Sequence, residues 1–296
     1  MTVANTEPAV DQGNTQLSVD LKPLARVGAK PQFFDYLIST WNYRHFVLYD
    51  SRARVQSGNR QDRLGSAWLL LNPLLNGLGY FLIFGVLLGA SRGIENFIGY
   101  LVIGVFLFQI STRSIVNGSK VIRANQNVIQ AFNFPRATLV LSVNVREFIA
   151  NIPVLLAMLL LISLIPPVEE ITWRWLLLLP ALTLQLIFNL GVGFLLAPWV
   201  ARFNDLVHVI SFLMRFWLFA SCVMFSIDRY ASWPLIKSAV ELNPLYLLLS
   251  IVRSSLLYAE TPPWQSWAAL AAWAFGALAM GIICFWRGEE TYGRND

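Results

Sequence analysis

Six long apolar stretches constrain this chain more than any other feature of its sequence. They cover about 67–88, 97–116, 137–165, 174–199, 206–227 and 265–286. Each holds roughly the 20 residues that a helix needs to cross a hydrocarbon core about 30 Å thick. A helix satisfies its own backbone hydrogen bonds in lipid, and the short alternating segments typical of barrel strands do not occur here. The sequence therefore predicts an all-α integral membrane protein with six transmembrane helices.

Composition excludes several classes of function. Only 13% of the 296 residues are charged and 56% are hydrophobic, whereas a soluble domain carries about 25% charged residues. A soluble enzyme, a disordered regulator and a nucleic-acid-binding protein are therefore not expected. The formal net charge of +5 is explained by the Lys and Arg that membrane proteins gather in their cytoplasmic loops.

The distribution of Lys and Arg predicts the orientation in the membrane. One side of the predicted spans carries Arg44, Arg52, Arg54, Arg60, Arg63, Lys120, Arg123, Arg136, Arg202, Arg287 and Arg294. The other side carries Arg92, Arg229, Lys237 and Arg253, with Arg174 at a boundary. The positive-inside rule then places both termini in the cytoplasm and the chain, as a multi-pass protein, in the cytoplasmic (inner) membrane.

The segments outside the spans divide the chain into four parts. We expect a disordered cytoplasmic tail over 1–30, an amphipathic interface helix and basic linker over 31–63, the six-span domain over 64–287, and a cytoplasmic tail over 288–296. Apolar residues at helical spacing over 33–50 predict a helix that rests in the cytoplasmic interface.

Two connections between spans carry further helical patterns. The cytoplasmic loop 117–136 presents Val121, Ile122, Val128 and Ile129 at helical spacing, and we expect these exposed apolar side chains to contact a partner. The external connection 228–264 holds two short amphipathic runs around Asn243 and Pro244. These runs predict short or re-entrant helices before the last span.

Known catalytic and nucleotide-binding motifs do not occur in the sequence. There is no G-x-x-x-x-G-K-[ST] phosphate-binding loop and no G-x-S-x-G nucleophile elbow. The two histidines, His45 and His208, have no Cys or carboxylate at metal-ligand spacing. We expect no catalytic residues, no metal and no cofactor on this chain. A membrane glycan-synthesis enzyme stays the alternative from a different class, and it would need convergent carboxylates on one loop.

Charged residues inside spans are costly and are candidates for function. They are Arg113, Arg146, Glu147 and Arg215. We expect Glu147 to pair with Arg113 or Arg215 inside the bundle, because adjacent residues such as Arg146 and Glu147 point in different directions on a helix. Aromatic residues on the first and fifth spans could line a conduit for a hydrated solute. They are Tyr80, Phe81, Phe84, Phe212, Phe216, Trp217 and Phe219.

Four motifs carry a resemblance to a known family. Asn125-Gln-Asn-Val-Ile-Gln-Ala-Phe-Asn-Phe-Pro-Arg136 resembles the N-x-N-L-I-x-K-x-x-F-P-R signature of polysaccharide-export permeases of the type-2 ABC class. Residues 64–74 resemble the family's L-G-x-x-W-x-x-L-x-P-L pattern, 202–205 resemble its R-Y-R-D turn, and 242–245 resemble its N-P break. The resemblance runs from about 34 to 287 with these elements in order.

The resemblance implies a transport subunit that exports a lipid-linked polysaccharide of the cell-wall galactan, teichoic-acid or O-antigen (lipopolysaccharide) type. It implies a homodimer with two copies of a separate ABC ATPase, which binds the ATP and Mg²⁺. The ATPase-coupling residues would be Ser119, Lys120, Val121, Ile122, Arg123, Asn125, Asn127, Val128, Ile129, Phe134, Pro135 and Arg136. Spans one and five would line the conduit, and the helices around Asn243 and Pro244 would form the external gate.

A polyprenyl-diphosphate-linked glycan would approach Arg44, Arg52 and Arg54 at the cytoplasmic membrane surface, where cations attract the diphosphate. Membrane lipid is the other expected partner, and nucleic acid is not expected. The nearest alternative is a permease of the same architecture for a drug, a lipid or another small hydrophobic solute, and a non-transporting scaffold is a third.

Overall fold

The computed structural model describes residues 32–57, 65, 67–87, 94, 96–132, 134–164, 171–289 and 292. The described residues belong to one compact unit within 31–296. The predicted tail over 1–30, the last part of the basic linker and most of the C-terminal tail lie outside the described residues. The same holds for Arg60, Arg63, Arg92 and Arg294, which the orientation argument counts.

The described part of the chain is helical and contains no strand. In chain order the helices are α1 (Phe33–Asn42), α2 (Arg44–Ser57), α3 (Ala67–Tyr80), the π-helix η1 (Phe81–Leu87), α4 (Phe97–Ser119), α5 (Val121–Ala124), α6 (Gln126–Ala131), α7 (Ala137–Leu164), the 3-10 helix η2 (Trp173–Leu177), α8 (Leu178–Arg202), α9 (Leu206–Ala220), the 3-10 helix η3 (Ile227–Tyr230), α10 (Pro234–Glu241), α11 (Pro244–Leu256) and α12 (Trp264–Arg287). The all-α fold is as predicted.

Five helical segments of the described residues are long and apolar enough to span a membrane. They are Leu70–Leu87, Phe97–Ser119, Ala137–Leu164, Trp173–Arg202 and Trp264–Arg287. A sixth arises if α10 and α11, which meet at a bend of 78°, count as one broken span. The chain is therefore a multi-pass membrane protein, and the two short helices expected around Asn243 are present.

The predicted fifth span, 206–227, is wrong in its length. Helix α9 has 15 residues and ends at Ala220, so it rises only about 22 Å, less than the roughly 30 Å of a hydrocarbon core. The apolar sequence continues to Phe225, but the backbone turns at Cys222, whose φ is +50°. Residues 222–225 are buried in the protein core, so their apolar character reflects packing inside the bundle and not further helix.

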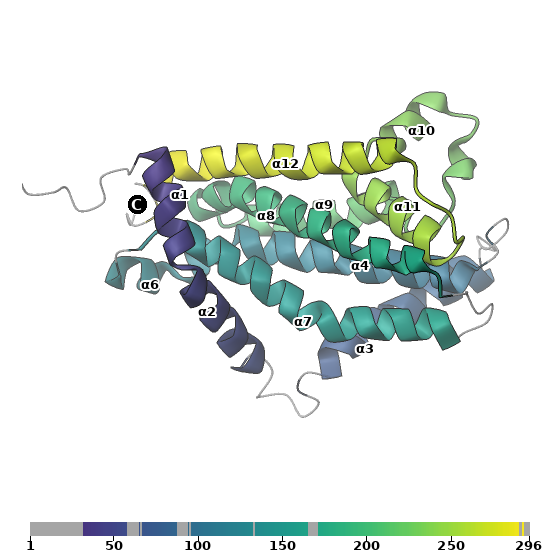
Figure 1. The fold of residues 1–296 in the computed structure, drawn as a ribbon, viewed down its shortest axis with the longest axis horizontal. Coiled ribbons are helices and arrows are strands. Elements are labelled where there is room, and N and C mark those ends of the chain that lie inside the picture. Colours follow the sequence, from purple (N-terminus) through teal and green to yellow (C-terminus); the bar gives the residue numbers. More distant parts are fainter. Residues whose placement is uncertain are drawn as a thin grey trace, which may run out of the picture. The chain divides into compact units, whose positions relative to one another are not determined.

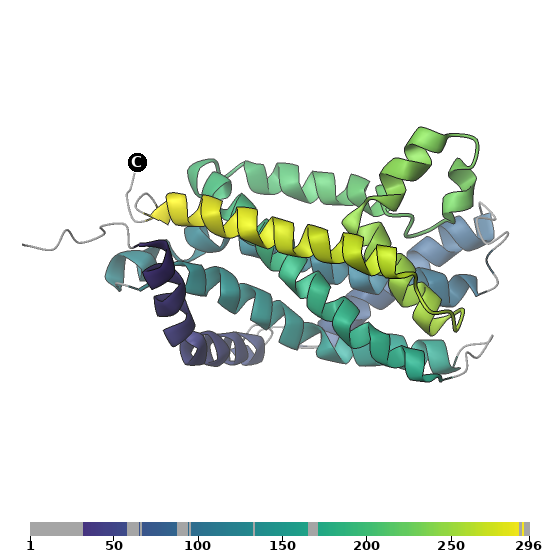
Figure 2. The same ribbon diagram turned by 45° about the horizontal axis from the view of Figure 1, so that its top comes forward.

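Helix α4 lies at the centre of the bundle and contacts α7, α8 and α11. Within its span 78% of the residues are buried, against 11% for Leu70–Leu87. The outer helix α12 lies along α8, and α1 lies beside its C-terminal end in both views (Figures 1 and 2). The segment α3–η1 therefore offers most of its surface to lipid or to another chain.

The two connections that the sequence singled out lie at opposite ends of the bundle. Helix α6 lies at the end where α1 and the C-terminal end of α12 meet, and α10 and α11 lie at the other end (Figure 1). This arrangement agrees with a cytoplasmic loop 117–136 and an external connection 228–264. We call these the coupling end and the outer end.

Candidate functional site: the coupling end, the passage and the outer end

The coupling end is tied together by a buried carboxylate on Glu289. The Tyr36 hydroxyl donates to its Oε2 at 2.8 Å, and the Arg136 backbone N–H donates to its Oε1 at 3.0 Å. The Arg136 guanidinium also donates to the Glu289 carbonyl oxygen. We call Tyr36, Arg136 and Glu289 the C-terminal junction. Burial raises the pKa of Glu289 and outweighs the lowering by Arg136 and Tyr36, and it likewise raises the pKa of the Tyr36 hydroxyl.

The predicted single helix over 33–50 is two helices, α1 and α2, which meet at Tyr43. Tyr36 and Thr40 are buried against the bundle, whereas Phe34, Ile38 and Trp41 are exposed on the opposite face of α1. An apolar face that the protein leaves uncovered at a membrane surface fits the predicted contact with lipid.

The coupling segment is also divided, because α5 and α6 meet at Asn125. The Asn125 amide donates to the Val121 carbonyl at 2.8 Å, and its oxygen accepts from Arg54 Nη2 at 3.0 Å. Arg54 also binds Asp50 Oδ1 through Nε at 2.8 Å. Arg54, predicted to attract the diphosphate of a substrate, therefore joins α2 to the coupling segment.

The prediction that the apolar residues of this segment are exposed is wrong for three of them. Val121, Ile122 and Ile129 are only 2–5% exposed, because α1, α7, α8 and α12 supply the residues that cover them in a second small core. Val128 is half-buried. The exposed residues of the segment, which we call the coupling face, are Lys120, Arg123, Ala124, Asn127, Gln130, Ala131 and Phe132.

The remaining predicted coupling residues support this segment from within. Ser119 is buried and donates to the Val116 carbonyl at 2.9 Å. Phe134 packs on Phe46, with ring centroids 6.2 Å apart. Pro135 is half-buried at the start of α7. These positions shape the coupling segment more than they offer contact surface.

The other predicted phosphate-attracting cations, Arg44 and Arg52, are exposed on α2. The Arg44 guanidinium lies over the Trp41 ring, with its central carbon 5.8 Å from the ring centroid. These two side chains stay available at the coupling end, unlike Arg54.

The predicted ion pair of Glu147 with Arg113 or Arg215 does not form among the described residues, although the charges of Glu147 and Arg113 interact at longer range. Among the described residues Glu147 pairs with its neighbour Arg146, whose Nη2 lies 3.0 Å from Oε1. The same oxygen accepts from Asn117 Nδ2 on α4 at 2.9 Å. The Arg146 side chain therefore reaches a carboxylate that Asn117 holds in place. Arg215 is exposed on α9.

The predicted conduit residues differ in where their side chains point: most lie at the surface of the bundle, exposed or half-buried, and one points into it. Phe212, Phe216 and Phe219 are 45–58% exposed along one face of α9, and Phe84 of η1 lies beside Phe219 with ring centroids 6.4 Å apart. Tyr80 and Phe81 are half-buried.

Trp217 is the predicted conduit residue whose side chain points into the bundle. It packs edge-on against Phe188, and its indole N–H donates to Asn243 Oδ1 at 2.9 Å. The structure therefore does not place Trp217 on the exposed face of α9.

Asn243, predicted as part of the external gate, caps α11 at the bend with α10. Its oxygen accepts from the Leu245 N–H and from Trp217, and its amide donates to the Ala220 carbonyl and to Ser221 Oγ. Pro244, buried at the first position of α11, suits the start of a helix because it has no N–H to satisfy. The bend is thus fastened to the end of α9.

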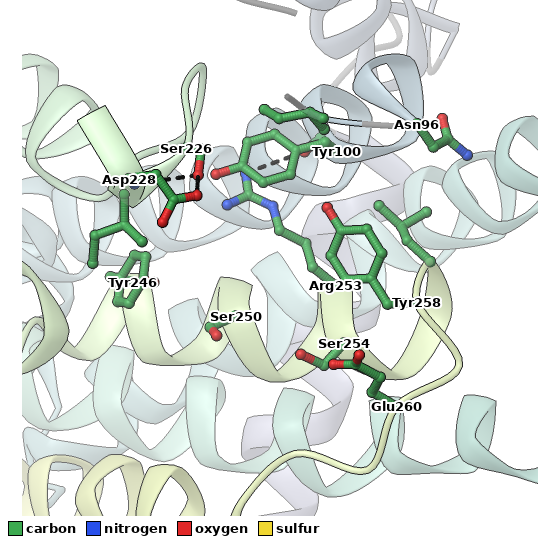
Figure 3. Close-up of a pocket in the computed structure, with 13 residues that line it drawn as sticks. Asn96, Tyr100, Ser226, Asp228, Tyr246, Ser250, Arg253, Ser254, Tyr258 and Glu260 are labelled. Atoms are coloured by element: carbon green, nitrogen blue, oxygen red, sulfur yellow. Dashed lines mark hydrogen bonds between the residues drawn. The ribbon is translucent and has the colours of Figure 1, made fainter. Parts of the chain in front are cut away.

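Sequence reasoning missed Arg253, which it counted among external loop charges. This α11 side chain is 3% exposed. It donates to the Cys222, Tyr100 and Val223 carbonyls at 3.1 Å each, and its central carbon lies 3.3 Å from the Tyr100 ring centroid. Figure 3 shows the guanidinium beside that ring at one wall of a cavity. A single charge in the apolar run 245–257 was the available signal.

The bonds of Arg253 also hold a strained turn. The Cys222 carbonyl accepts from Arg253 and from the Tyr100 hydroxyl, which also donates to the Phe225 carbonyl at 2.8 Å. These bonds fix the left-handed conformation of Cys222, which is rare for a residue with a side chain. Within the described residues no group of three or more His, Cys, Asp or Glu could hold a metal ion.

A family comparison now identifies the class of this helical bundle. The profile of the ABC-2 type transporters matches residues 53–257, which run from α2 through α11 and so include the coupling segment and the bend at Asn243. The chain belongs to the ABC-2 type transporter family. This membership agrees with a membrane-spanning permease that has an exposed coupling face.

Individual relatives in this family are similar over most of their length. The O-antigen export system permease protein RfbA of Myxococcus xanthus is 26% identical over 255 residues, covering 85% of this chain and 93% of that protein. Two proteins of the same name from Klebsiella pneumoniae are each 27% identical, over 218 and 238 residues. They cover 72% and 76% of this chain, and 76% and 86% of their own length.

Proposed function

We propose that this chain is the permease subunit of an ABC transporter that exports a lipid-linked polysaccharide across the cytoplasmic membrane. The observation that carries the proposal is the match to O-antigen export permeases over 85% of the chain, combined with a coupling face on a protein without a phosphate-binding loop of its own. In this proposal the exported polysaccharide is a galactan, a teichoic acid or an O-antigen.

In this proposal the energy for transport comes from a separate ATPase that binds ATP and Mg²⁺, and the complex contains two copies of the ATPase and two of this chain. The ATPase contacts the coupling face, whose exposed residues include Arg123, Asn127 and Phe132. The buried side of the same segment packs on α7 and α8. A displacement of the coupling face is therefore passed to two spanning helices, since packed cores do not absorb such shifts.

The passage in this proposal runs between two copies of the chain. The exposed face of α9 and the largely uncovered segment Leu70–Leu87 are two of the surfaces that the described bundle leaves uncovered. Aromatic rings on α9 would offer a sugar chain their faces, while its hydroxyls stay hydrated. Arg44 and Arg52 would attract the diphosphate of the lipid carrier at the coupling end.

An experiment on the coupling face tests the proposal. The permease is expressed with its ATPase, and surface glycan and permease-stimulated ATP hydrolysis are measured. We expect R123E combined with F132D to reduce both at least tenfold while the permease still reaches the membrane. R287E reverses an equally exposed cation outside the coupling face and serves as the matched control. Normal export by the double variant would contradict the proposal.

An apolar cavity keeps the small-solute alternative open. It has a volume of about 500 Å³, lies between α1, α2, α7, α8 and α12, and has Arg44 of α2 among its lining residues. Such a cavity suits a hydrophobic solute. If the permease transports such a solute, its deletion leaves surface glycan unchanged and sensitises cells to that solute. Loss of surface glycan on deletion supports polysaccharide export instead.

A further inference from the structure

The outer end contains a cavity of about 820 Å³ that no part of the proposed transport cycle uses. It lies between α4, the Ser226–Asp228 turn, α11 and the segment that follows α11. Its volume falls within the roughly 300–1,000 Å³ of pockets that hold small organic ligands. We call it the outer cavity (Figure 3).

One wall of the outer cavity includes the buried side chain of Arg253. Its Nη1 and Nη2 are bonded to carbonyls, and its Nε has no hydrogen-bond partner in the described part of the chain but is covered by protein. A side chain on Gly104 would come within 2.6 Å of Arg253 Nη2, so the glycine makes room for the guanidinium. Arg253 therefore gives this wall a positive charge and a fixed shape, and its hydrogen bonds go to the protein.

Two carboxylates lie on opposite sides of this cation. Asp228 is held in place because the Ser226 hydroxyl donates to its Oδ2 at 2.7 Å. Glu260 is positioned by its backbone N–H, which donates to the Ser254 carbonyl at 2.9 Å. Figure 3 shows the two acidic side chains on either side of Arg253. Two carboxylates around one cation disfavour an anionic ligand and favour a neutral one rich in hydroxyl groups.

Aromatic rings complete the lining. Tyr246 and Tyr258 line the cavity from α11 and from the segment after it, and the neighbouring Ala259 has φ of +47°. A pyranose ring has apolar C–H faces that pack on aromatic rings, and hydroxyl groups that donate to carboxylates. Tyrosine rings and carboxylates around a cavity of this size together match that chemistry.

We propose that the outer cavity binds one or two sugar residues of the exported glycan at the outer end of the permease. The proposal rests on the proposed function. Asp228 and Glu260 accept hydrogen bonds from sugar hydroxyls, Tyr246 packs on the ring face, and the buried Arg253 holds this wall of the cavity in place. The site would retain the growing or emerging chain outside the passage.

The test uses the complete permease–ATPase complex in lipid nanodiscs. Binding of methyl glycosides of galactose, mannose, rhamnose and N-acetylglucosamine is measured by saturation-transfer NMR, with inorganic pyrophosphate as the anionic probe. We expect at least one glycoside to bind, and D228N combined with E260Q, or Y246L alone, to weaken that binding at least tenfold. Both carboxylates are exposed, so their replacement should not unfold the protein.

Matched controls lie at the same end of the molecule. E241Q removes an exposed carboxylate of α10, and W233L removes an exposed aromatic ring, both outside the cavity lining. Both should leave glycoside binding unchanged. The proposal is overturned if no glycoside binds, if the cavity variants bind as the controls do, or if pyrophosphate binds and the glycosides do not. A different result would contradict the proposed function itself: deletion of the permease would leave the amount of surface glycan unchanged.

Discussion

Arg253 shows how one residue organises the outer end of this permease. Its charge is buried without a carboxylate partner among the described residues, and three carbonyl oxygens and the face of Tyr100 surround it. Hydrogen bonds to charged groups contribute about 1.5–3 kcal/mol each. The residue therefore holds the turn at Cys222 against α4 and, through that turn, one wall of the outer cavity.

Replacing Arg253 by methionine should lower the free energy of unfolding by about 3 kcal/mol or more, because three carbonyls each lose a hydrogen bond to a charged donor. Lysine should restore part of the loss. Thermal unfolding in detergent measures the effect. K237M, which removes a more exposed cation at the same end, should change the Tm little. Equal Tm values for R253M and K237M would show that Arg253 does not hold the turn.

The buried carboxyl group of Glu289 should make the stability of the coupling end depend on pH. Burial raises its pKa above the ordinary 4.5, so the folded chain holds the proton more tightly than the unfolded one. The contribution of this group to stability is then full below pH 4.5 and is lost as the pH rises through the raised value. We expect α1 to be held less firmly at higher pH.

Amide hydrogen exchange of α1, corrected for the intrinsic rate, tests this expectation. In the wild type, protection of Tyr36–Thr40 should fall as the pH rises, and E289Q should flatten the profile. E241Q, which alters an exposed carboxylate at the outer end, should keep the wild-type slope. The same slope in E289Q and wild type would rule out Glu289 as the titrating group.

At the scale of elements, the contact between α8 and α12 depends on two glycines. A side chain on Gly191 would overlap the backbone of Ala277 and Leu278, and one on Gly281 would overlap the Gly191 carbonyl. Membrane helices approach closely where small residues face each other. The two helices thus pack backbone to backbone at this crossing.

G191V or G281V should separate α8 and α12 and destabilise the permease by several kcal/mol, since neither backbone can move aside. G276V is the matched control, because a side chain at Gly276 meets nothing within 4 Å. The amount of monodisperse protein in detergent and its Tm report the effect. Tolerance of valine at Gly191 would mean that the crossing is looser than described.

The sequence predicts the existence of these elements better than their ends. Apolar runs locate α4, α7, α8 and α12 within a few residues, because lipid demands a long apolar helix. The same rule overextends α9, since 222–225 are apolar for a different reason, namely burial beneath Arg253 and Tyr100. The sequence also suggests that Val121, Ile122 and Ile129 are exposed, because only the tertiary structure shows that α1, α7, α8 and α12 cover them.

At the scale of the whole molecule, α9 and the segment Leu70–Leu87 present neighbouring exposed surfaces, since Phe84 lies beside Phe219. Along α9, Val209, Phe212, Leu213 and Phe216 are 48–58% exposed, and the segment Leu70–Leu87 is mostly uncovered. Within the proposed dimer these surfaces face the second copy across the passage. Sequence analysis found their aromatic residues but did not separate the exposed Phe212 and Phe216 from Trp217, which points into the bundle, because residue type alone does not show which ring packs inward.

Cysteine cross-linking tests this arrangement. In a background without Cys222 and Cys284, L213C on α9 should form dimers with a short bis-maleimide. F275C, equally exposed at 56% but on α12, is the control and should stay monomeric. Cross-linking through F275C and not through L213C would place the second copy on the opposite side of the bundle.

The hydrogen bonds of Asn243 affect how movement of α9 could be transmitted to the outer end of the permease. Its side chain is bonded both to the last turn of α9 and to Trp217, while the Leu242 carbonyl next to it accepts from Trp273 of α12. The bend between α10 and α11 is therefore hydrogen-bonded both to α9, which borders the proposed passage, and to the last span, α12. If α9 tilts during transport, α10 must swing with it, so widening of the passage and release at the outer surface would occur as one movement.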